Sequence, residues 1–128
     1  MILIVGGVFQ GKLEFAKSLK ESGVEPERIV DGENLDEEQL ASADVVNHFH
    51  LYLRSLLEQG REVTAAVQSL LERNPQVILV AAELGCGVVP MDAFDRQYRE
   101  TVGRVCCRLA KEAQAVYRVT CGIGVRIK

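Results

Sequence analysis

The chain has 128 residues, a length typical of one domain with a buried core, so we expect residues 1–128 to form a single domain. Apolar residues make up 48% and charged residues 26%, and the net charge is −3 without a long run of one sign. This balance argues against a nucleic-acid-binding or membrane-bound protein. The apolar run 1–5 is far shorter than a membrane span and lacks the flanks of a signal peptide, which favours a cytoplasmic location.

The first predicted element is a strand over residues 1–5, which leads directly into a glycine-rich loop and then a helix. The spacing from Gly6 to Gly11 and Lys12 matches the pattern G-x-x-x-x-G-K-[ST] of phosphate-binding loops (P-loops). In such loops backbone N–H groups surround phosphate oxygens, and the lysine reaches the outer phosphates. We therefore predict a nucleotide site formed by Gly6, Gly7, Val8, Phe9, Gln10, Gly11, Lys12 and Leu13. The alternative is a glycine-rich turn that binds nothing.

The last position of this pattern departs from the rule. A Ser or Thr hydroxyl normally helps to hold Mg²⁺ beside the nucleotide, and Leu13 has no such group. The loop therefore predicts phosphate binding but argues against a well-held Mg²⁺.

The remaining elements alternate between helix and strand patterns. After the loop, apolar residues at helical spacing predict a helix that ends near Ser22 and Gly23. Further strands are predicted over residues 27–30, 43–48, 77–82, 115–120 and 123–128, and further helices over 36–40, 51–57, 63–73 and 91–113. Residues 77–82 form a continuous apolar run, which is typical of a strand covered on both faces. This order predicts an α/β fold with a mainly parallel sheet.

The four cysteines do not indicate a metal site. Cys86, Cys106, Cys107 and Cys121 form no CxxC pair and have no His-rich partner segment, so we predict no metal ligands among them. We expect buried structural thiols without disulfides.

Three blocks of the chain resemble one enzyme family. The blocks are residues 4–12, residues 77–90 and residues 115–123. The second block is similar to a strand followed by Asn-Glu-Val-Gly-x-Gly-(Ile/Val)-Val-Pro, with a helix like residues 94–100 after it. This pattern resembles the adenosylcobinamide kinase/adenosylcobinamide-phosphate guanylyltransferase family of cobalamin biosynthesis. The resemblance implies a P-loop NTPase-like three-layer fold, GTP or ATP as nucleotide, a corrinoid as second ligand and a homo-oligomer.

The chain also departs from that family at positions that carry chemistry. The family loop ends in Arg-Ser-Gly-Lys-Ser, whereas this chain has Phe9, Gln10, Gly11, Lys12 and Leu13. Asn47 stands where the family has an acidic Walker-B-like residue, and an amide cannot supply that negative charge. The segment that carries the guanylylated histidine of the family is also absent. Together these differences argue against Mg²⁺ and against full activity.

A few side chains remain candidates for a role in the site. Lys12 and Glu83 are the candidate catalytic residues, and the resemblance places Glu83 at the nucleotide or substrate site. His48 and His50 follow a predicted strand, where α/β sheets bind ligands, but the nucleophile role does not transfer to them. They are either local site residues or polar residues at a strand end. Arg96 and Arg99 either approach phosphate or form a solvated helix face.

Two functions from different classes follow from these residues. The first is an enzyme of the kinase/guanylyltransferase type with weakened or lost catalysis. The second is a non-catalytic protein that binds a nucleotide or a corrinoid, or that pairs with an active enzyme.

Overall fold

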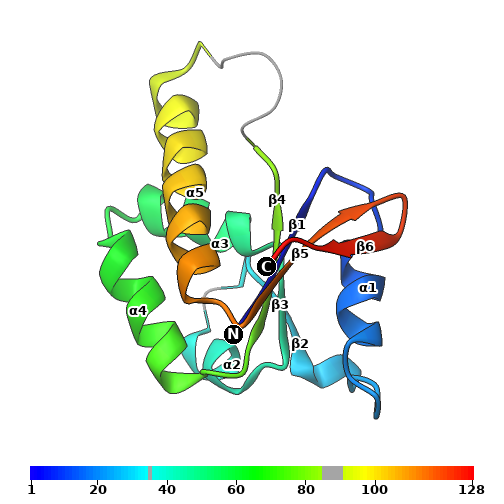
Figure 1. Ribbon diagram of the computed structural model, residues 1–128. Coiled ribbons are helices and arrows are strands. Elements are labelled where there is room, and N and C mark those ends of the chain that lie inside the picture. The colour runs from blue at the N-terminus through cyan, green and yellow to red at the C-terminus, as the bar shows by residue number, and fades with distance from the viewer. Residues whose placement is uncertain (35, 85–90) are drawn as a thin grey trace.

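The computed structural model describes residues 1–34, 36–84 and 91–128, which form one sheet with helices on both faces (Figure 1). The strands are β1 (Ile2–Gly6), β2 (Ile29–Asp31), β3 (Val45–Asn47), β4 (Ile78–Ala82), β5 (Ala115–Thr120) and β6 (Ile123–Arg126). The helices are α1 (Lys12–Ser18), α2 (Glu37–Ser42), α3 (Phe49–Glu58), α4 (Val63–Arg73) and α5 (Ala93–Glu112), with a short 3-10 helix at Pro26–Arg28. The predicted α/β class is thus confirmed.

The described strands have the order β2-β3-β4-β1-β5-β6, and among them only the β5–β6 pair is antiparallel. β1 lies between β4 and β5, with Gly6 opposite Ala82 and Ile2 opposite Ala115. The carboxyl ends of β1, β3 and β4 therefore meet at one edge of the sheet. This is the edge at which parallel α/β sheets bind their ligands.

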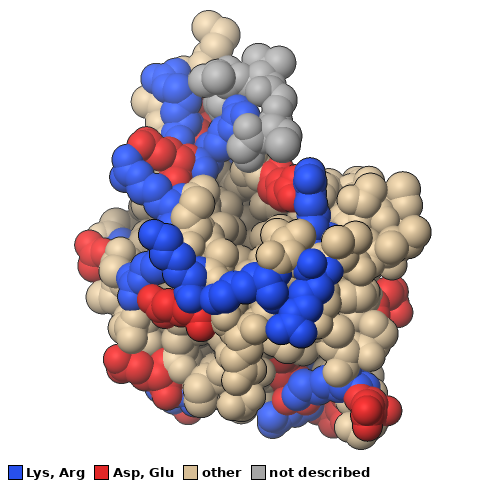
Figure 2. All heavy atoms as spheres, in the orientation of Figure 1, with Lys and Arg blue, Asp and Glu red and all other residues tan. Residues whose placement is uncertain are grey.

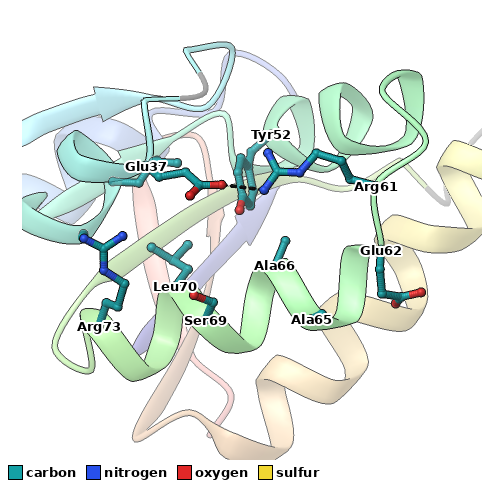
Figure 3. A pocket seen from close by; sticks show the side chains of 11 residues that line it. Glu37, Tyr52, Arg61, Glu62, Ala65, Ala66, Ser69, Leu70 and Arg73 are labelled. Carbon is teal, nitrogen blue, oxygen red and sulfur yellow. Dashed lines mark hydrogen bonds and ion pairs between the residues drawn. The ribbon is translucent and has the colours of Figure 1, made fainter.

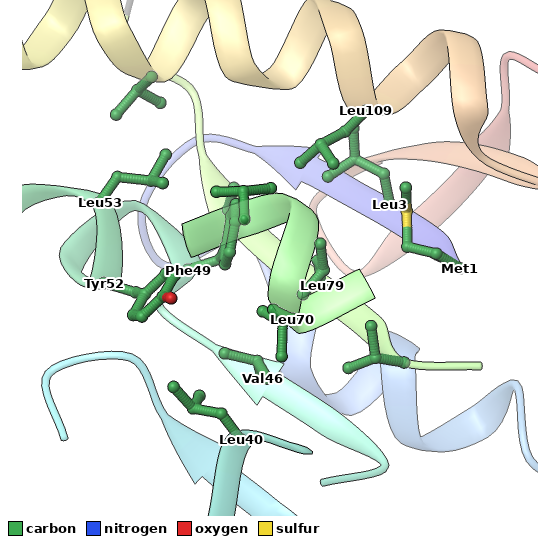
Figure 4. Packing of buried hydrophobic residues seen from close by; sticks show 14 of the residues in the cluster. Met1, Leu3, Leu40, Val46, Phe49, Tyr52, Leu53, Leu70, Leu79 and Leu109 are labelled. Carbon is green, nitrogen blue, oxygen red and sulfur yellow. The ribbon is translucent and has the colours of Figure 1, made fainter. Parts of the chain in front are cut away.

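The sheet has an apolar cluster on each face, as expected for strands that are buried on both sides. On one face Ile4, Val45, Ile78, Val80 and Val119 pack with Ala16 of α1. On the other face a larger cluster joins the sheet to α2, α3, α4 and α5, and its members include Leu3, Val46, Phe49, Leu70 and Leu109 (Figure 4). The result is the three-layer arrangement that the family resemblance implied.

The last helix differs from its prediction at its first residue. The apolar spacing placed Met91 on the buried stripe of the helix, but α5 begins at Ala93 and Met91 is 94% exposed. The helix begins there because the Asp92 side chain accepts hydrogen bonds from the backbone N–H groups of Phe94 and Asp95, as an N-cap does. Of the rest of the stripe, Tyr98, Val102 and Leu109 are buried, whereas Phe94 and Val105 are partly buried against the core.

Within the described residues, no helix combines the length and the apolar character that crossing a membrane would need.

Candidate functional site

The glycine-rich loop lies between β1 and α1, as its sequence predicts. Gly11 adopts the left-handed conformation with φ 83°, which a glycine reaches without steric cost, and α1 begins at the next residue. Gly6 lies so close to β5 that a Cβ atom there would be 2.5 Å from the carbonyl oxygen of Val119. Phe9 also has a positive φ, of 59°, and its side chain is 99% exposed. The loop therefore depends on glycine at its base and at its end.

Lys12 is folded back over the loop. Its ammonium group donates a 2.6 Å hydrogen bond to the carbonyl oxygen of Gly7. Partial burial lowers the pKa of Lys12, and the negative charge of Glu83 partly offsets this. The ammonium thus lies at the loop, close to an acidic side chain.

Gln10 fixes the loop to the turn between β5 and β6. Its backbone carbonyl oxygen accepts a 2.7 Å hydrogen bond from the N–H of Gly122. Its side-chain oxygen accepts another, also of 2.7 Å, from the N–H of Cys121. Sequence reasoning did not identify this contact, because nothing in the loop pattern indicates which distant segment will pack against it.

A pocket of about 380 Å³ opens beside the loop and brings several predicted residues together. Its lining includes Phe9, Lys12, Asn47, His48, His50 and Ala82. The loop residues come from the β1–α1 connection, and the two histidines come from the β3–α3 connection. The histidines therefore line the same cavity as the loop. The sequence did not decide between this placement and polar residues at a strand end.

The two positions that would anchor a metal do not offer the groups that Mg²⁺ prefers. Leu13 packs against the apolar cluster around Ile4 and has no oxygen to offer. Asn47 ends β3 at the pocket, but its side chain is a neutral amide. Mg²⁺ favours carboxylate and phosphate oxygens, so these two side chains do not fit the anchoring of a magnesium ion.

Glu83 follows directly after β4 and pairs with Arg118 of β5. The Arg118 Nε atom lies 3.0 Å from Oε1 of Glu83, and its Nη2 atom donates to Oε2 at 3.2 Å. The backbone N–H of Glu83 also donates to the carbonyl oxygen of Gly6 at 3.0 Å. Since β1 lies between β4 and β5, this two-point ion pair spans the end of the strand that carries the loop.

The two histidines have different hydrogen-bond partners. His48 Nδ1 lies 2.8 Å from Oδ2 of Asp31, at the end of β2. His50 Nδ1 accepts a 3.1 Å hydrogen bond from the backbone N–H of Ala82. Burial, together with the charges of His48 and Lys12, lowers the pKa of His50 to about 4, although the charge of Asp31 acts in the opposite direction. His50 is therefore neutral at pH 7.

The other candidates from the sequence lie away from this pocket or outside the described residues. Arg96 is on α5 and donates to the carbonyl oxygen of Met91, and neither Arg96 nor Arg99 is among the residues that line the loop pocket. The family-like residues Gly85, Gly87 and Pro90 lie outside the described residues, as does Cys86. Of the other cysteines, Cys106 is partly buried, whereas Cys107 and Cys121 are exposed. The prediction of buried thiols is therefore wrong for these last two, because Cys107 lies off the buried stripe of α5 and Cys121 is in a surface turn.

A second pocket, also of about 380 Å³, lies between α2 and α4 (Figure 3). Tyr52 lies at its inner wall, and Glu37 and Arg61 pair across its rim. Burial raises the pKa of Tyr52. None of the predicted site residues lines this pocket among the residues described.

Basic side chains gather on the face formed by the second half of α5 and the end of the chain (Figure 2). Arg104, Arg108 and Lys111 come from α5, and Arg126 and Lys128 come from the chain end. Several of these cations already have partners. Arg108 pairs with Glu112, and the Lys128 ammonium donates to the carbonyl oxygens of Ala110 and Lys111 at the end of α5. Lys128 therefore helps to cap the C-terminal end of α5.

The chain is similar to known proteins of one family. The family model for cobinamide kinase / cobinamide phosphate guanyltransferase matches residues 33–127. The chain is 43% identical over 70 residues to the bifunctional adenosylcobalamin biosynthesis protein CobU of Escherichia coli, covering 52% of this chain and 39% of the relative. It is 47% identical over 53 residues to the protein of the same name from Salmonella typhimurium, covering 41% of this chain and 29% of the relative.

The chain thus spans less than two fifths of the length of these two relatives. The family match begins at Glu33, after the glycine-rich loop, so the loop and the match are independent observations. Because the match covers most of the sheet and the four helices α2, α3, α4 and α5, the chain belongs to the cobinamide kinase / cobinamide phosphate guanyltransferase family.

Proposed function

We propose that this chain binds the phosphates of GTP or ATP at Gly6 to Lys12 and acts in cobalamin biosynthesis with weakened phosphoryl or nucleotidyl transfer. The observation that carries this proposal is the position of Lys12. Its ammonium is held 2.6 Å from the carbonyl oxygen of Gly7, beside a pocket of about 380 Å³. A lysine held on the loop in this way is in place to contact the outer phosphates.

The site favours binding that depends little on Mg²⁺. Lys12 and the loop N–H groups supply positive charge and hydrogen-bond donors without a metal, whereas Leu13 and Asn47 do not fit one. Phosphoryl transfer relies on positioning and on stabilising the charge of the transferred group. We therefore propose that the chain retains affinity for nucleotide but transfers phosphate slowly.

Glu83 has a supporting role in this proposal. Its carboxylate is held by Arg118 and acts electrostatically on Lys12. A carboxylate has about four acceptor positions, so Glu83 can still accept a hydrogen bond from a ribose or substrate hydroxyl while it is paired. This arrangement supports a place for Glu83 beside the bound ligand.

Calorimetric titration with GTP and with ATP, in Mg²⁺ and in EDTA, tests the binding. We expect binding in both conditions and a loss of affinity of about tenfold or more in Lys12→Ala, because a charge-assisted contact to phosphate is lost. The matched control is Lys17→Ala, which removes an equal charge from the same helix but only an exposed pair with Glu14. Absence of binding, or equal effects of the two variants, would overturn the proposal.

A transfer assay with adenosylcobinamide and GTP or ATP tests the weakened catalysis. We expect slow transfer in the natural chain, and Mg²⁺-dependent nucleotide binding in the double variant Leu13→Ser with Asn47→Asp, because this restores a hydroxyl and a carboxylate. Rapid, strictly Mg²⁺-dependent transfer by the natural chain would contradict slow catalysis.

The second candidate is a non-catalytic protein that binds a nucleotide or a corrinoid and serves as a regulatory or partner protein. The replacement of both metal-anchoring positions, at Leu13 and Asn47, favours it. Nucleotide binding without any transfer would support this candidate over the enzyme. Self-association is a further proposal, based on the family alone, and light scattering of the purified chain tests it.

A further inference from the structure

Asp31 and His48 form an aspartate–histidine pair at the pocket. β2 and β3 are parallel neighbours that place Asp31 opposite Asn47, and His48 follows immediately. One oxygen of Asp31, Oδ2, lies 2.8 Å from His48 Nδ1, and the other accepts a 2.9 Å hydrogen bond from the N–H of Glu33. Burial raises the pKa of Asp31, but the hydrogen bonds from Glu33 and His48 outweigh it and lower the pKa. Asp31 is therefore ionised at pH 7.

This pairing determines which nitrogen of His48 carries the proton. An ionised carboxylate only accepts hydrogen bonds, so Nδ1 of His48 must donate to Asp31. In the neutral ring the lone pair is then on Nε2. An imidazole oriented by a carboxylate in this way has the arrangement of a general base.

The backbone around His48 is held in an unusual conformation. His48 has a φ of 51°, which is uncommon for a residue other than glycine, and it lies at the start of α3. The N–H of Gly32 donates to the carbonyl oxygen of Asn47 at 2.7 Å, and a Cβ at Gly32 would lie 2.2 Å from the carbonyl oxygen of His48. The turn after β2 therefore packs directly against the backbone of His48 and fixes its position.

His50 has the opposite tautomer. Because its Nδ1 accepts the N–H of Ala82, the neutral ring carries its proton on Nε2. The two rings meet edge to face, with centroids 5.8 Å apart, and both histidines line the pocket beside the loop. One imidazole thus offers an acceptor nitrogen and the other an N–H donor, next to Lys12.

We propose that His48 is the general base that accepts the proton of a hydroxyl group on the second substrate, and that Asp31 is its positioning residue. This inference rests on the proposed nucleotide site. The proton of the hydroxyl moves to Nε2 of His48, and its oxygen forms a bond to the terminal phosphorus of the nucleoside triphosphate. The bond from that phosphorus to the bridging oxygen breaks, and the nucleoside diphosphate leaves with the electron pair. His48 needs no metal ion to accept this proton.

Single-turnover transfer of the terminal phosphate of GTP or ATP to adenosylcobinamide tests the base. In His48→Asn the amide nitrogen can still donate to Asp31, but the variant lacks the basic nitrogen. We expect a fall of about 100-fold or more in the transfer rate and a dissociation constant for the nucleotide within about twofold of the natural chain. Transfer at the natural rate would overturn the role of His48.

The role of Asp31 is tested by Asp31→Asn, with Glu33→Gln as a control that removes a neighbouring exposed charge. We expect the rate to fall about tenfold in Asp31→Asn and to change little in the control. In both variants the dissociation constant for the nucleotide should stay within about twofold of the natural chain. A transfer rate in Asp31→Asn equal to that of the natural chain would overturn the positioning role.

A measurement independent of turnover is available because the chain has only 2 histidines. Nitrogen-15 NMR of the imidazoles at neutral pH should show one ring protonated on Nδ1, assigned to His48, and one protonated on Nε2, assigned to His50. The same tautomer for both rings would overturn the inference.

The outcomes also separate this inference from the proposed function. Absence of nucleotide binding would remove the proposed function. Nucleotide binding with no detectable transfer, or with transfer that does not depend on His48, would overturn only the role of His48 as general base.

Discussion

The side-chain oxygen of Gln10 accepts a 2.7 Å hydrogen bond from the backbone N–H of Cys121, a residue 111 positions later in the chain. This contact, with the one from Gly122 to the carbonyl oxygen of Gln10, joins the loop to the β5–β6 turn. The conformation of the loop therefore depends on a hairpin at the other end of the sequence.

Gln10→Ala tests this dependence. The backbone contact remains, but the side-chain acceptor is lost, so the free energy of unfolding should fall by about 0.5–1.5 kcal/mol. The affinity for nucleotide should fall several-fold because the loop is less well ordered before binding. Urea denaturation and calorimetry measure the two effects. Gln76→Ala is a suitable control, since this glutamine is exposed and distant in sequence from the loop, and an equal loss there would contradict the prediction.

Two glycines should respond to alanine in opposite ways. In Gly6→Ala the new Cβ would lie 2.5 Å from the carbonyl oxygen of Val119, so β1 and β5 must move apart, at a cost of about 1–3 kcal/mol. In Gly103→Ala the new Cβ would meet no atom within 4 Å outside the adjoining backbone of α5, and alanine favours the helix by about 0.5–1 kcal/mol. Thermal unfolding of both variants measures the difference, and a stable Gly6→Ala would show that the close approach is not maintained.

The stability of the protein should fall in acid partly through His50. The pKa of this group in the folded chain is about 4, whereas an ordinary histidine has 6.5, so the unfolded chain binds the proton more readily. The contribution of neutral His50 to the free energy of unfolding is therefore complete above pH 6.5 and is lost as the pH falls towards 4. His50→Asn keeps an acceptor for the N–H of Ala82 but does not titrate.

We expect the difference in unfolding free energy between pH 7 and pH 4.5 to be smaller in His50→Asn by about 1–2 kcal/mol, a figure that allows for solvent screening of this half-buried ring. Chemical denaturation at the two pH values measures it. If the unfolding free energy depends on pH identically in the natural chain and in His50→Asn, this role of His50 in acid stability is refuted.

Asn74 holds the end of α2. Its side-chain nitrogen donates to the carbonyl oxygens of Leu40, at 3.0 Å, and Ala43, at 2.8 Å. Asn74→Ala leaves these partly buried acceptors without this donor and should destabilise the fold by about 1–3 kcal/mol. Asn34→Ala removes exposed hydrogen bonds only and should cost less. Equal losses in the two variants, measured by urea denaturation, would argue against this role of Asn74.

The sequence predicts the elements of this fold well, because each depends on local patterns. The apolar run 77–82 and the spacing along α5 identify buried faces directly. The strand order is a property of the whole chain, and so is the pairing of β2 with β3. The contact between Asp31 and His48 follows from that pairing. The sequence alone therefore does not indicate that an aspartate in a turn-like Asp-Gly and a histidine at a strand end lie in contact.

The ends of the elements depend on contacts that the spacing of apolar residues does not indicate. Met91 fits the helical spacing, but the hydrogen bonds of Asp92 begin the helix after it. The glycine-rich loop was predictable because its spacing is local, whereas its attachment to Cys121 and the Glu83–Arg118 pair join segments that are distant in sequence.

The position of β1 also bears on how fast a ligand can bind. This strand is hydrogen-bonded to a neighbour on each side, so the base of the glycine-rich loop is in place before any ligand arrives. A nucleotide that enters the pocket then spends little free energy on ordering the chain. Association at this loop should follow a single diffusional encounter, without a slow rearrangement of the sheet.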